Sequence, residues 1–256
     1  MGLFEKKFCD VCGEKIGLFG TRKLEDGKIC SRCAGKLSPW FGERRRSTLE
    51  EIKAQLAYRE DNRRLVAEFH TTRSLGGHTR VLLDEDARRF LVTEARDLAE
   101  ANPDVLDYAQ VTGCELDIDE HRQEEYRQVD GKSVSYNPRR FRYSYDFYVT
   151  IRVNHRYFNE MRFRLNSSSV EVGSQPMGAG LGGWSLHRPG AGEYQQYIQM
   201  GNEIKEALTQ ARQEAREEIQ AQNAPKAARV CPFCGATTFP DASGRCEYCG
   251  SPVGDA

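Results

Sequence analysis

The clearest feature of the hydrophobic pattern is an unbroken alternation over residues 141–153. Every odd position from Phe141 to Val153 is apolar or aromatic, and the even positions between them are mostly polar. Successive side chains of a β-strand point to opposite faces of its sheet. The pattern therefore predicts a long antiparallel strand with one buried face.

Shorter segments of similar pattern surround this strand, and a helical pattern follows it. Strands are predicted at Leu65–Thr72, Thr79–Leu83, Arg88–Val92, Val111–Ile118 and Tyr157–Leu165, with a turn or short helix at Ala95–Asn102. From Glu193 to about Gln220 the apolar spacing becomes three to four residues. That spacing is typical of an amphipathic helix, so a C-terminal helix is predicted to close this domain.

A helix is also predicted ahead of the strands, over residues 47–64. Ser47 and Glu50 have the spacing of a capping box, in which two side chains satisfy the first backbone N–H groups. Leu49, Ile52 and Leu56 then follow on one side. This segment is interpreted as a helix that links residues 1–46 to the strands.

Residues 1–46 show only short elements. Asp26-Gly27 favours a hairpin turn, and the segment from Cys30 to Leu37 favours a short helix that Pro39 stops. So small a segment buries too little apolar surface to fold without help. A metal is the expected source of that stability.

Eight of the nine cysteines form two groups of C-x-x-C pairs. The predicted metal ligands are Cys9, Cys12, Cys30 and Cys33 in one group, and Cys231, Cys234, Cys246 and Cys249 in the other. Four thiolates match the tetrahedral shell of structural Zn²⁺. The sequence therefore predicts two closed zinc sites, that is, two Zn²⁺ per chain.

The cysteines could instead form disulfide bonds or bind iron. Disulfide scaffolds spread their cysteines through a small domain, whereas here 80 residues separate Cys33 from Cys114. Iron could occupy a rubredoxin-like site at the C-terminal group. An electron-transfer role would need a second redox centre, and none is visible. Zinc is the preferred interpretation.

The front segment resembles an uncharacterised bacterial four-cysteine zinc-binding domain family. The matching residues are C-D-V-C-G-E-K-I-G-L-F-G, L-E-D-G-K-I-C-S-R-C and K-L-S-P. The resemblance implies a zinc module without an established activity. The order of knuckle, hairpin and cysteine pair at a helix start is treble-clef-like. The C-terminal C-P-F-C-G and C-E-Y-C-G similarly resemble a small bacterial zinc ribbon.

The middle domain looks like a bacterial pleckstrin-homology-like domain. V-T-G-C-E-L-D-I-D-E and the long strand after it are similar to strands of that superfamily. The resemblance implies a closed antiparallel barrel with a C-terminal helix, and a recognition scaffold in place of an active site. The phosphoinositide binding known from eukaryotic relatives is not expected, because no hairpin carries a comparable cluster of Lys and Arg.

The charge is unevenly distributed over 256 residues of net charge −1. Residues 1–46 carry eleven Lys and Arg against six Asp and Glu, whereas residues 47–225 sum to −6. A four-thiolate zinc site itself contributes about −2, so the front segment is only mildly basic. This gives nucleic-acid binding little support. No apolar run approaches the roughly 18 residues of a transmembrane helix.

Two segments are candidates for contact with a partner. Arg44, Arg45 and Arg46 form a triplet that is interpreted as a solvated linker, with a phosphate or acidic-partner contact as the alternative. Trp184 lies in a Gly-rich segment with the spacing G-x-G-x-x-G. Because no helix follows to hold a pyrophosphate, a surface loop is preferred over a dinucleotide site. Trp184 could anchor a partner or fold back on its own domain.

The remaining reactive residues do not form a catalytic motif. Cys114 is expected to be a buried small hydrophobe. The five histidines have no H-x-x-x-H or H-E-x-x-H spacing, and no P-loop or serine triad stands out. The chain is therefore not expected to be an enzyme.

These observations predict an α+β protein of three modules. The expected divisions are a four-cysteine module at 1–46, a linking helix at 47–64, a pleckstrin-homology-like domain at 65–222, a linker at 223–230 and a zinc ribbon at 231–254. The expected function is that of a cytoplasmic, non-enzymatic adaptor that binds another protein. The alternative is a nucleic-acid-binding accessory protein that uses the basic front module. A lipid-headgroup binder is a weaker third option, and membrane association is not expected.

Overall fold

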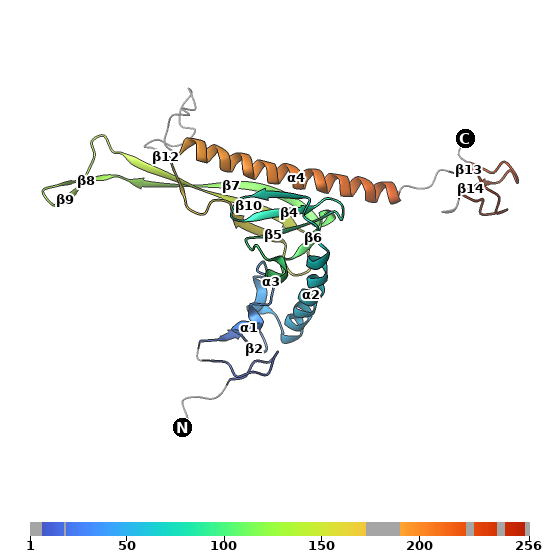
Figure 1. Cartoon of the computed structure of the whole chain (residues 1–256), viewed down its shortest axis with the longest axis horizontal. Coiled ribbons are helices and arrows are strands. Elements are labelled where there is room, and N and C mark those ends of the chain that lie inside the picture. The colour runs from blue at the N-terminus through green and yellow to red at the C-terminus, as the bar shows by residue number, and fades with distance from the viewer. Residues whose placement is uncertain (1–6, 18, 173–189, 224–227, 240–243, 254–256) are drawn as a thin grey trace. The chain divides into compact units, whose positions relative to one another are not determined.

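The computed structural model describes residues 7–17, 19–172, 190–223, 228–239 and 244–253. Its internal contacts divide the chain into two compact units, Met1–Gln213 and Glu214–Ala256. The fold mixes helices with sheets, and every strand pairing in the described part of the chain is antiparallel. Figure 1 shows the elements in chain order.

The first unit opens with a small module of short elements. Strands β1 (Thr21–Lys23) and β2 (Lys28–Cys30) form a hairpin, and helix α1 (Ser31–Ala34) and the 3-10 helix η1 (Glu43–Arg46) follow. Its apolar core comprises Ile16, Leu24, Ile29 and Leu37, together with Ile52 from the next helix. The core of this module therefore extends onto the helix that follows it.

Helix α2 (Leu49–Glu68) begins at a capping box, one residue later than the sequence predicted. Thr48 Oγ1 accepts a hydrogen bond from Glu51 N at 3.3 Å, and Glu51 Oε2 accepts one from Thr48 N at 2.8 Å. The prediction of Ser47 as the cap was wrong because its hydroxyl donates to the carbonyl of Glu43 instead, at 3.1 Å.

The second half of α2 replaces the strand predicted at Leu65–Thr72, so that prediction was wrong. Val66 is buried in a cluster with Leu82, Leu91 and Val105, and Leu65 and Phe69 pack against the same cluster. Positions 65, 66 and 69 have helical spacing, so a helix can direct all three side chains at one sheet. Burial against that sheet decides the conformation of this segment.

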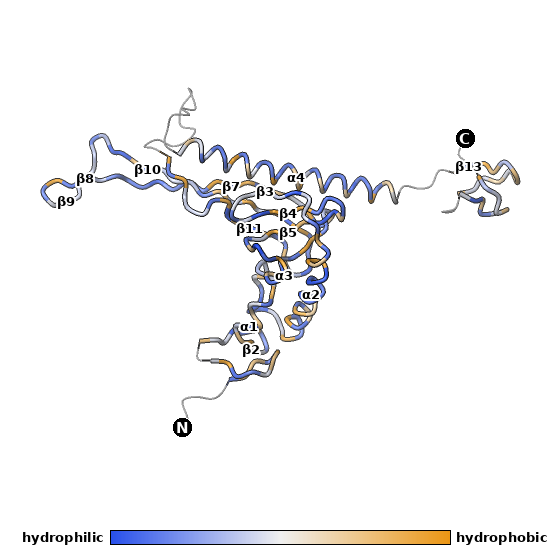
Figure 2. Tube along the Cα trace, in the orientation of Figure 1, coloured by the Kyte–Doolittle hydropathy of each residue, from blue (hydrophilic) through white to orange (hydrophobic). Residues whose placement is uncertain are grey.

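Four strands after α2 form a meander. They are β3 (Arg73–Gly76), β4 (Arg80–Asp84), β5 (Arg89–Thr93) and β6 (Val105–Asp107), paired in that order, with helix α3 (Leu98–Ala101) before the last strand. The predicted strands at 79–83 and 88–92 correspond closely to β4 and β5. Both strands are rich in hydrophobic residues (Figure 2), and these residues are buried.

The 3-10 helix η2 (Tyr108–Gln110) leads into a second sheet around one long central strand. Strand β10 spans Phe141–Val153, as the alternation predicted, and pairs on one edge with β7 (Val111–Glu124). On its other edge it pairs with β11 (Glu160–Arg164) and β12 (Val170–Val172). Strands β8 (Tyr126–Val129) and β9 (Lys132–Ser135) form a hairpin between β7 and β10.

The described residues do not form the closed barrel that the sequence analysis expected. The meander and the β10 sheet have no strand pairing with one another. The turn before β4 contacts the second sheet, because Thr79 Oγ1 donates to the carbonyl of Arg164 in β11 at 3.2 Å, and η2 connects β6 to β7. Two open antiparallel sheets in contact therefore replace the barrel.

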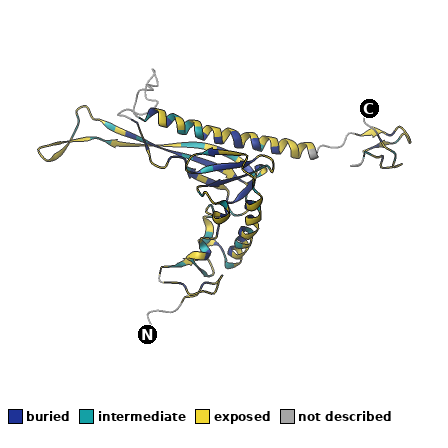
Figure 3. Cartoon of the chain, in the orientation of Figure 1, coloured by how far each residue is buried: buried dark blue, intermediate teal, exposed yellow. Residues whose placement is uncertain are grey.

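Helix α4 (Ala191–Asn223) covers one face of the β10 sheet. The Tyr194 ring lies edge-on to Phe147 at 5.2 Å, and Tyr197 stacks on Phe147 at 5.4 Å. A Cβ on Gly201 would lie 2.5 Å from Leu116 Cδ1, so any larger residue here would force the Leu116 side chain to move. Outward-facing positions of α4 are exposed (Figure 3).

The second unit contains the end of α4 and a small hairpin. Strands β13 (Arg229–Val230) and β14 (Thr237–Thr238) pair with each other. Within the described residues 228–239 and 244–253, the buried apolar residues are Cys231, Cys246 and Val253. Without a metal, so small a core is insufficient to hold a fold.

Candidate metal centres

The first half of the N-terminal cluster is a tight turn. Gly13 N donates to the carbonyl of Cys9 at 2.8 Å, and Cys9 N donates to the carbonyl of Glu14 at 2.9 Å. Gly13 has a φ of 71°, a left-handed conformation that glycine adopts without steric cost. This turn directs the side chains of Cys9 and Cys12 toward the same point.

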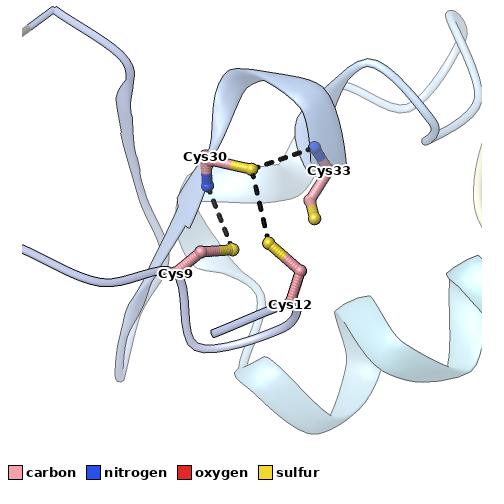
Figure 4. A group of neighbouring side chains, drawn as sticks. All are labelled: Cys9, Cys12, Cys30 and Cys33. Atoms are coloured by element: carbon pink, nitrogen blue, oxygen red, sulfur yellow. Dashed lines mark hydrogen bonds between the residues drawn. The ribbon is translucent and has the colours of Figure 1, made fainter. Parts of the chain in front are cut away.

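The second half of the cluster comes from the start of α1. Cys30 caps this helix, and its sulfur accepts a hydrogen bond from Cys33 N at 3.4 Å. Cys30 N donates in turn to the sulfur of Cys9 at 3.2 Å. Figure 4 shows the four side chains converging. The turn, the hairpin and the helix start that the sequence predicted are therefore the elements that position the ligands.

The sulfur spacing fits a tetrahedral metal site. All four sulfurs lie within 4.8 Å of one another, and Cys12 Sγ is 3.8 Å from Cys30 Sγ. A Zn–S distance of about 2.3 Å in a tetrahedron separates neighbouring sulfurs by about 3.8 Å. Cys9 and Cys33 are buried, whereas Cys12 is exposed. The cluster is thus able to hold one metal ion near the surface.

At this cluster, backbone amides favour the thiolate form of Cys9, whereas burial and the hydrogen bond with Cys30 raise the pKa of Cys33. Burial raises the pKa of Cys9, but backbone N–H groups of Cys12, Cys30 and Val11 outweigh that effect and lower its pKa to about 6. Metal ligation requires the thiolate, so a lowered pKa reduces the proton competition for the site.

The C-terminal cluster uses the same turn twice. Gly235 N donates to the carbonyl of Cys231 and Gly250 N donates to the carbonyl of Cys246, each at 2.9 Å. Both glycines have positive φ, 73° and 71°. The two C-x-x-C-G segments therefore have matching local geometry, as expected for a zinc ribbon.

The sulfur distances at this second cluster also fit a tetrahedral ion. Cys231 Sγ lies 3.6 Å from Cys249 Sγ, and Cys234 Sγ lies 3.8 Å from Cys246 Sγ. Hydrogen bonds from the side chain and backbone of Ser251 lower the pKa of Cys249 to about 6. The chain therefore has two clusters of four cysteines, each able to hold one metal ion, and the donor set fits two structural zinc ions.

Of the arginine triplet, Arg44 is a structural residue. Its Nη1 donates to the carbonyl of Lys23 at 2.6 Å, and burial lowers its pKa, as do the nearby charges of Arg45 and Arg22. Arg46 pairs with Glu43 at 3.1 Å and is exposed, as is Arg45. Arg45 and Arg46 are therefore exposed on η1, whereas Arg44 is held by the backbone of β1. Trp184 and the Gly-rich segment lie outside the described residues.

Cys114 is buried on β7, as expected for a small hydrophobe. Burial is the main cause that raises its pKa to about 12. The neighbouring carboxylates of β7 are engaged by cations, since Arg162 Nη1 lies 2.9 Å from Asp117 Oδ2.

A buried polar network that the sequence analysis missed joins the N-terminal module to the meander. Asp104 is 0% exposed and accepts hydrogen bonds from Ser38 Oγ at 2.7 Å, Arg59 Nη1 at 2.8 Å and Tyr58 OH at 3.3 Å. Arg59 Nε also donates to the carbonyl of Lys36 at 3.2 Å. Ser38 and Lys36 follow shortly after Cys33, so this network connects the metal module to the rest of the unit.

Asn62 completes the network one helical turn further along α2. Its Nδ2 donates to the carbonyl of Pro103 at 2.7 Å, and its Oδ1 accepts from Val105 N at 2.9 Å. The sequence offered one signal for this buried network. It is the presence of an arginine and an asparagine on a helix that has few apolar positions.

These features define a protein in which one four-cysteine cluster precedes a mixed helix and sheet domain along the chain and a second cluster follows it. Residues 7–55 match a family described as a domain of unknown function (DUF4428). The match extends beyond the module expected at 1–46 and includes Ile52, the α2 residue buried in the module core. No curated protein and no solved structure matched the chain. Among the described residues, no helix has the length and apolar character to span a bilayer.

Proposed function

We propose that this chain is a non-catalytic interaction protein whose ends are stabilised by two structural zinc ions and whose β domain binds another protein. The observation that carries the proposal is the donor set of each cluster, four thiols within 4.8 Å of one another. Four thiolates fill a tetrahedral shell and leave no coordination position for substrate or water. Zinc bound in this way supplies a cross-link between chain segments.

The order of elements supports a pleckstrin-homology-like identity for the middle domain. A meander of four strands, β3 to β6, precedes a second four-stranded sheet of β7, β10, β11 and β12, and a C-terminal helix covers that sheet. An arrangement of antiparallel strands followed by a C-terminal helix is what the resemblance implies. The open sheets depart from it, and the β8–β9 hairpin adds to it. Domains with this scaffold serve recognition on many different surfaces.

The C-terminal cluster adds a second surface suited to protein contact. Phe233 and Tyr248 occupy matching positions in the two C-x-x-C turns and are 69% and 71% exposed. Exposed aromatic side chains are enriched where proteins bind one another. The two C-x-x-C turns that carry the cysteines therefore also carry two exposed aromatic side chains.

Affinity capture with the tagged, zinc-loaded full chain in its native host, followed by reconstitution, tests the proposal. A protein partner identified by mass spectrometry should bind the purified chain in defined stoichiometry. Phe233→Ser with Tyr248→Ser should show whether the ribbon takes part, with Ile219→Ser as a control on an exposed apolar position of α4. Turnover of a substrate that one point variant abolishes would overturn the proposal.

A nucleic-acid-binding role is the second candidate, because positive charge gathers on the N-terminal module. The charges of Arg45 and Arg22 both act on Arg44. A gel shift at about 50 mM salt tests this role, since phosphate contacts are strong there. Arg45→Ala with Arg46→Ala is the suitable variant, because Arg44 has a structural hydrogen bond. Absence of a shift for both DNA and RNA removes this candidate.

A further inference from the structure

Residues 122–142 form a projecting ribbon, here called the β arm. It consists of the ends of β7 and β10 and the hairpin β8–β9 (Figure 1). Every residue from 126 to 134 is exposed, and α4 does not cover this part of the sheet (Figure 3). The arm therefore has both faces and both outer edges open among the described residues.

Contacts within the arm, and not a hydrophobic core, hold it in its conformation. Four residue pairs join β8 to β9, Glu125 N donates to the carbonyl of Arg140 at 2.9 Å, and Ser135 Oγ donates to Glu124 at 2.5 Å. A two-stranded ribbon is marginally stable in water on its own. A third strand or another covering element would stabilise it.

The arm is a basic region on an acidic domain. It carries six Lys and Arg against three Asp and Glu, whereas residues 47–225 as a whole have a net charge of −6. Its acidic residues are partly neutralised, because Arg139 lies 3.7 Å from Glu124 and Arg142 lies 3.5 Å from Glu125.

Three arginines of the arm stack on aromatic rings. Arg122 lies 4.7 Å from the Phe141 ring, and Arg127 and Arg140 lie 5.8 Å and 4.6 Å from the Tyr136 ring. No carboxylate within the described residues forms an ion pair with these three. In the body of the sheet, by contrast, Arg152 is paired with Glu115 at 2.6 Å. The stacked guanidinium groups keep hydrogen-bond donors available for an incoming anion.

One face of the hairpin combines positive charge with apolar surface. Arg127 lies opposite Val134, and Val129 lies opposite Lys132, so the pleat places all four on the same face. Val129 and Val134 are 41% and 40% exposed. This face matches a strand in which every second residue is alternately acidic and apolar, because only every second side chain of a strand lies on the same face.

The base of the arm is hollowed. An open pocket of about 390 Å³ lies there, lined by Gln123, Glu124, Glu125, Tyr126, Tyr136 and Arg142. Tyr126 is 57% exposed beside it. Tyrosine and arginine dominate the binding energy of many protein interfaces. The pocket provides a place for one partner side chain next to the open edge of β8.

We propose that the β arm binds an extended acidic and apolar segment of a partner protein, which adds to the ribbon as a further strand. This inference rests on the proposed protein-binding function and names the surface that performs it. Strand addition uses the open backbone edge, while the alternating side chains set specificity. A long nucleic acid fits less well, because it would extend beyond the arm over residues that are acidic overall, and because Val129 and Val134 offer apolar surface that phosphates do not match.

Fluorescence anisotropy with the zinc-loaded full chain tests the inference. The probes are a labelled peptide in which every second residue is alternately Glu and Val or Phe, with Thr between them, a matched peptide with Lys in place of Glu, and a single-stranded oligothymidylate. We expect the acidic peptide to bind at least about tenfold more tightly than the basic one at low salt. Arg127→Glu with Lys132→Glu should weaken that binding at least about tenfold, and Val129→Ser with Val134→Ser should weaken it several-fold.

The matched control is Arg63→Glu with Arg64→Glu, which makes the same charge change on exposed positions of α2. An equal loss of peptide affinity in this control variant, or no preference of the chain for the acidic peptide, would overturn the inference. Tighter binding of oligothymidylate that the arm reversal abolishes would also overturn it, and would assign the arm to nucleic acid. If a captured protein partner still binds the arm variants, the arm is not its binding surface, but the proposed protein-binding function is unaffected.

Discussion

Replacement of Asp104 by alanine removes the acceptor that joins the N-terminal module, α2 and the meander. The carboxylate accepts three hydrogen bonds, from Ser38, Tyr58 and Arg59, and its side chain is 0% exposed. Arg59 itself is only 7% exposed, so its charge would remain buried without a partner. Breaking a buried ion pair in this way costs about 3–5 kcal/mol. That is a large part of the roughly 5–15 kcal/mol that stabilises an ordinary domain.

Urea unfolding of the zinc-loaded chain, followed by circular dichroism, measures this loss. Arg59→Met with Asp104→Leu should recover much of it, because well-packed apolar residues can replace a buried pair at little net cost. Arg63→Ala is the control, since Arg63 and its partner Glu60 are exposed. Its expected effect is within about 0.5 kcal/mol. A loss below about 1 kcal/mol for Asp104→Ala would refute the reasoning.

The same variant should also change the metal kinetics. Ser38 and Lys36 hold the chain just after Cys33 through Asp104 and Arg59. Zinc release to a coloured chelator should therefore accelerate at the N-terminal cluster by at least about tenfold, or about 1.4 kcal/mol. The C-terminal cluster serves as an internal reference, and its rate should not change. Equal acceleration at both clusters would contradict a local cause.

Three further predictions concern the metals, the helix and pH. Elemental analysis should return two zinc equivalents, and full chelation should lower the stability of the meander as well as of both cysteine modules, because Ile52 and α2 are shared. Gly201→Ala should destabilise by about 1–3 kcal/mol through its clash with Leu116, whereas Gly192→Ala, with open space around it, should be neutral or stabilising in thermal melts. Burial lowers the pKa of His155, so the unfolded chain binds more protons below its unfolded pKa of about 6.5, and stability should fall with decreasing pH there. His155→Phe should reduce that loss between pH 7.5 and about 6 in urea titrations, and an unchanged slope would refute the assignment.

Much of the candidate site could be predicted because its geometry is local. A C-x-x-C-G segment makes its own turn, so its cysteine side chains converge whatever the rest of the chain does. The same holds for β10, whose buried and exposed faces follow from alternation alone. The start of α2 was predicted to within one residue for a similar reason, since capping involves neighbours in sequence.

What the sequence by itself determined is thus the set of short-range features: the ligands, the long strand and the final helix. The tertiary structure decided the rest, because those features depend on partners far along the chain. Burial of Val66 against β4 and β5 turned a predicted strand into helix, and Asp104 meets Arg59 across 45 positions of sequence. The two open sheets and the exposed arm follow from which strand edges find partners. Hydrophobic periodicity specifies the face that a strand buries, but not the strand that lies beside it.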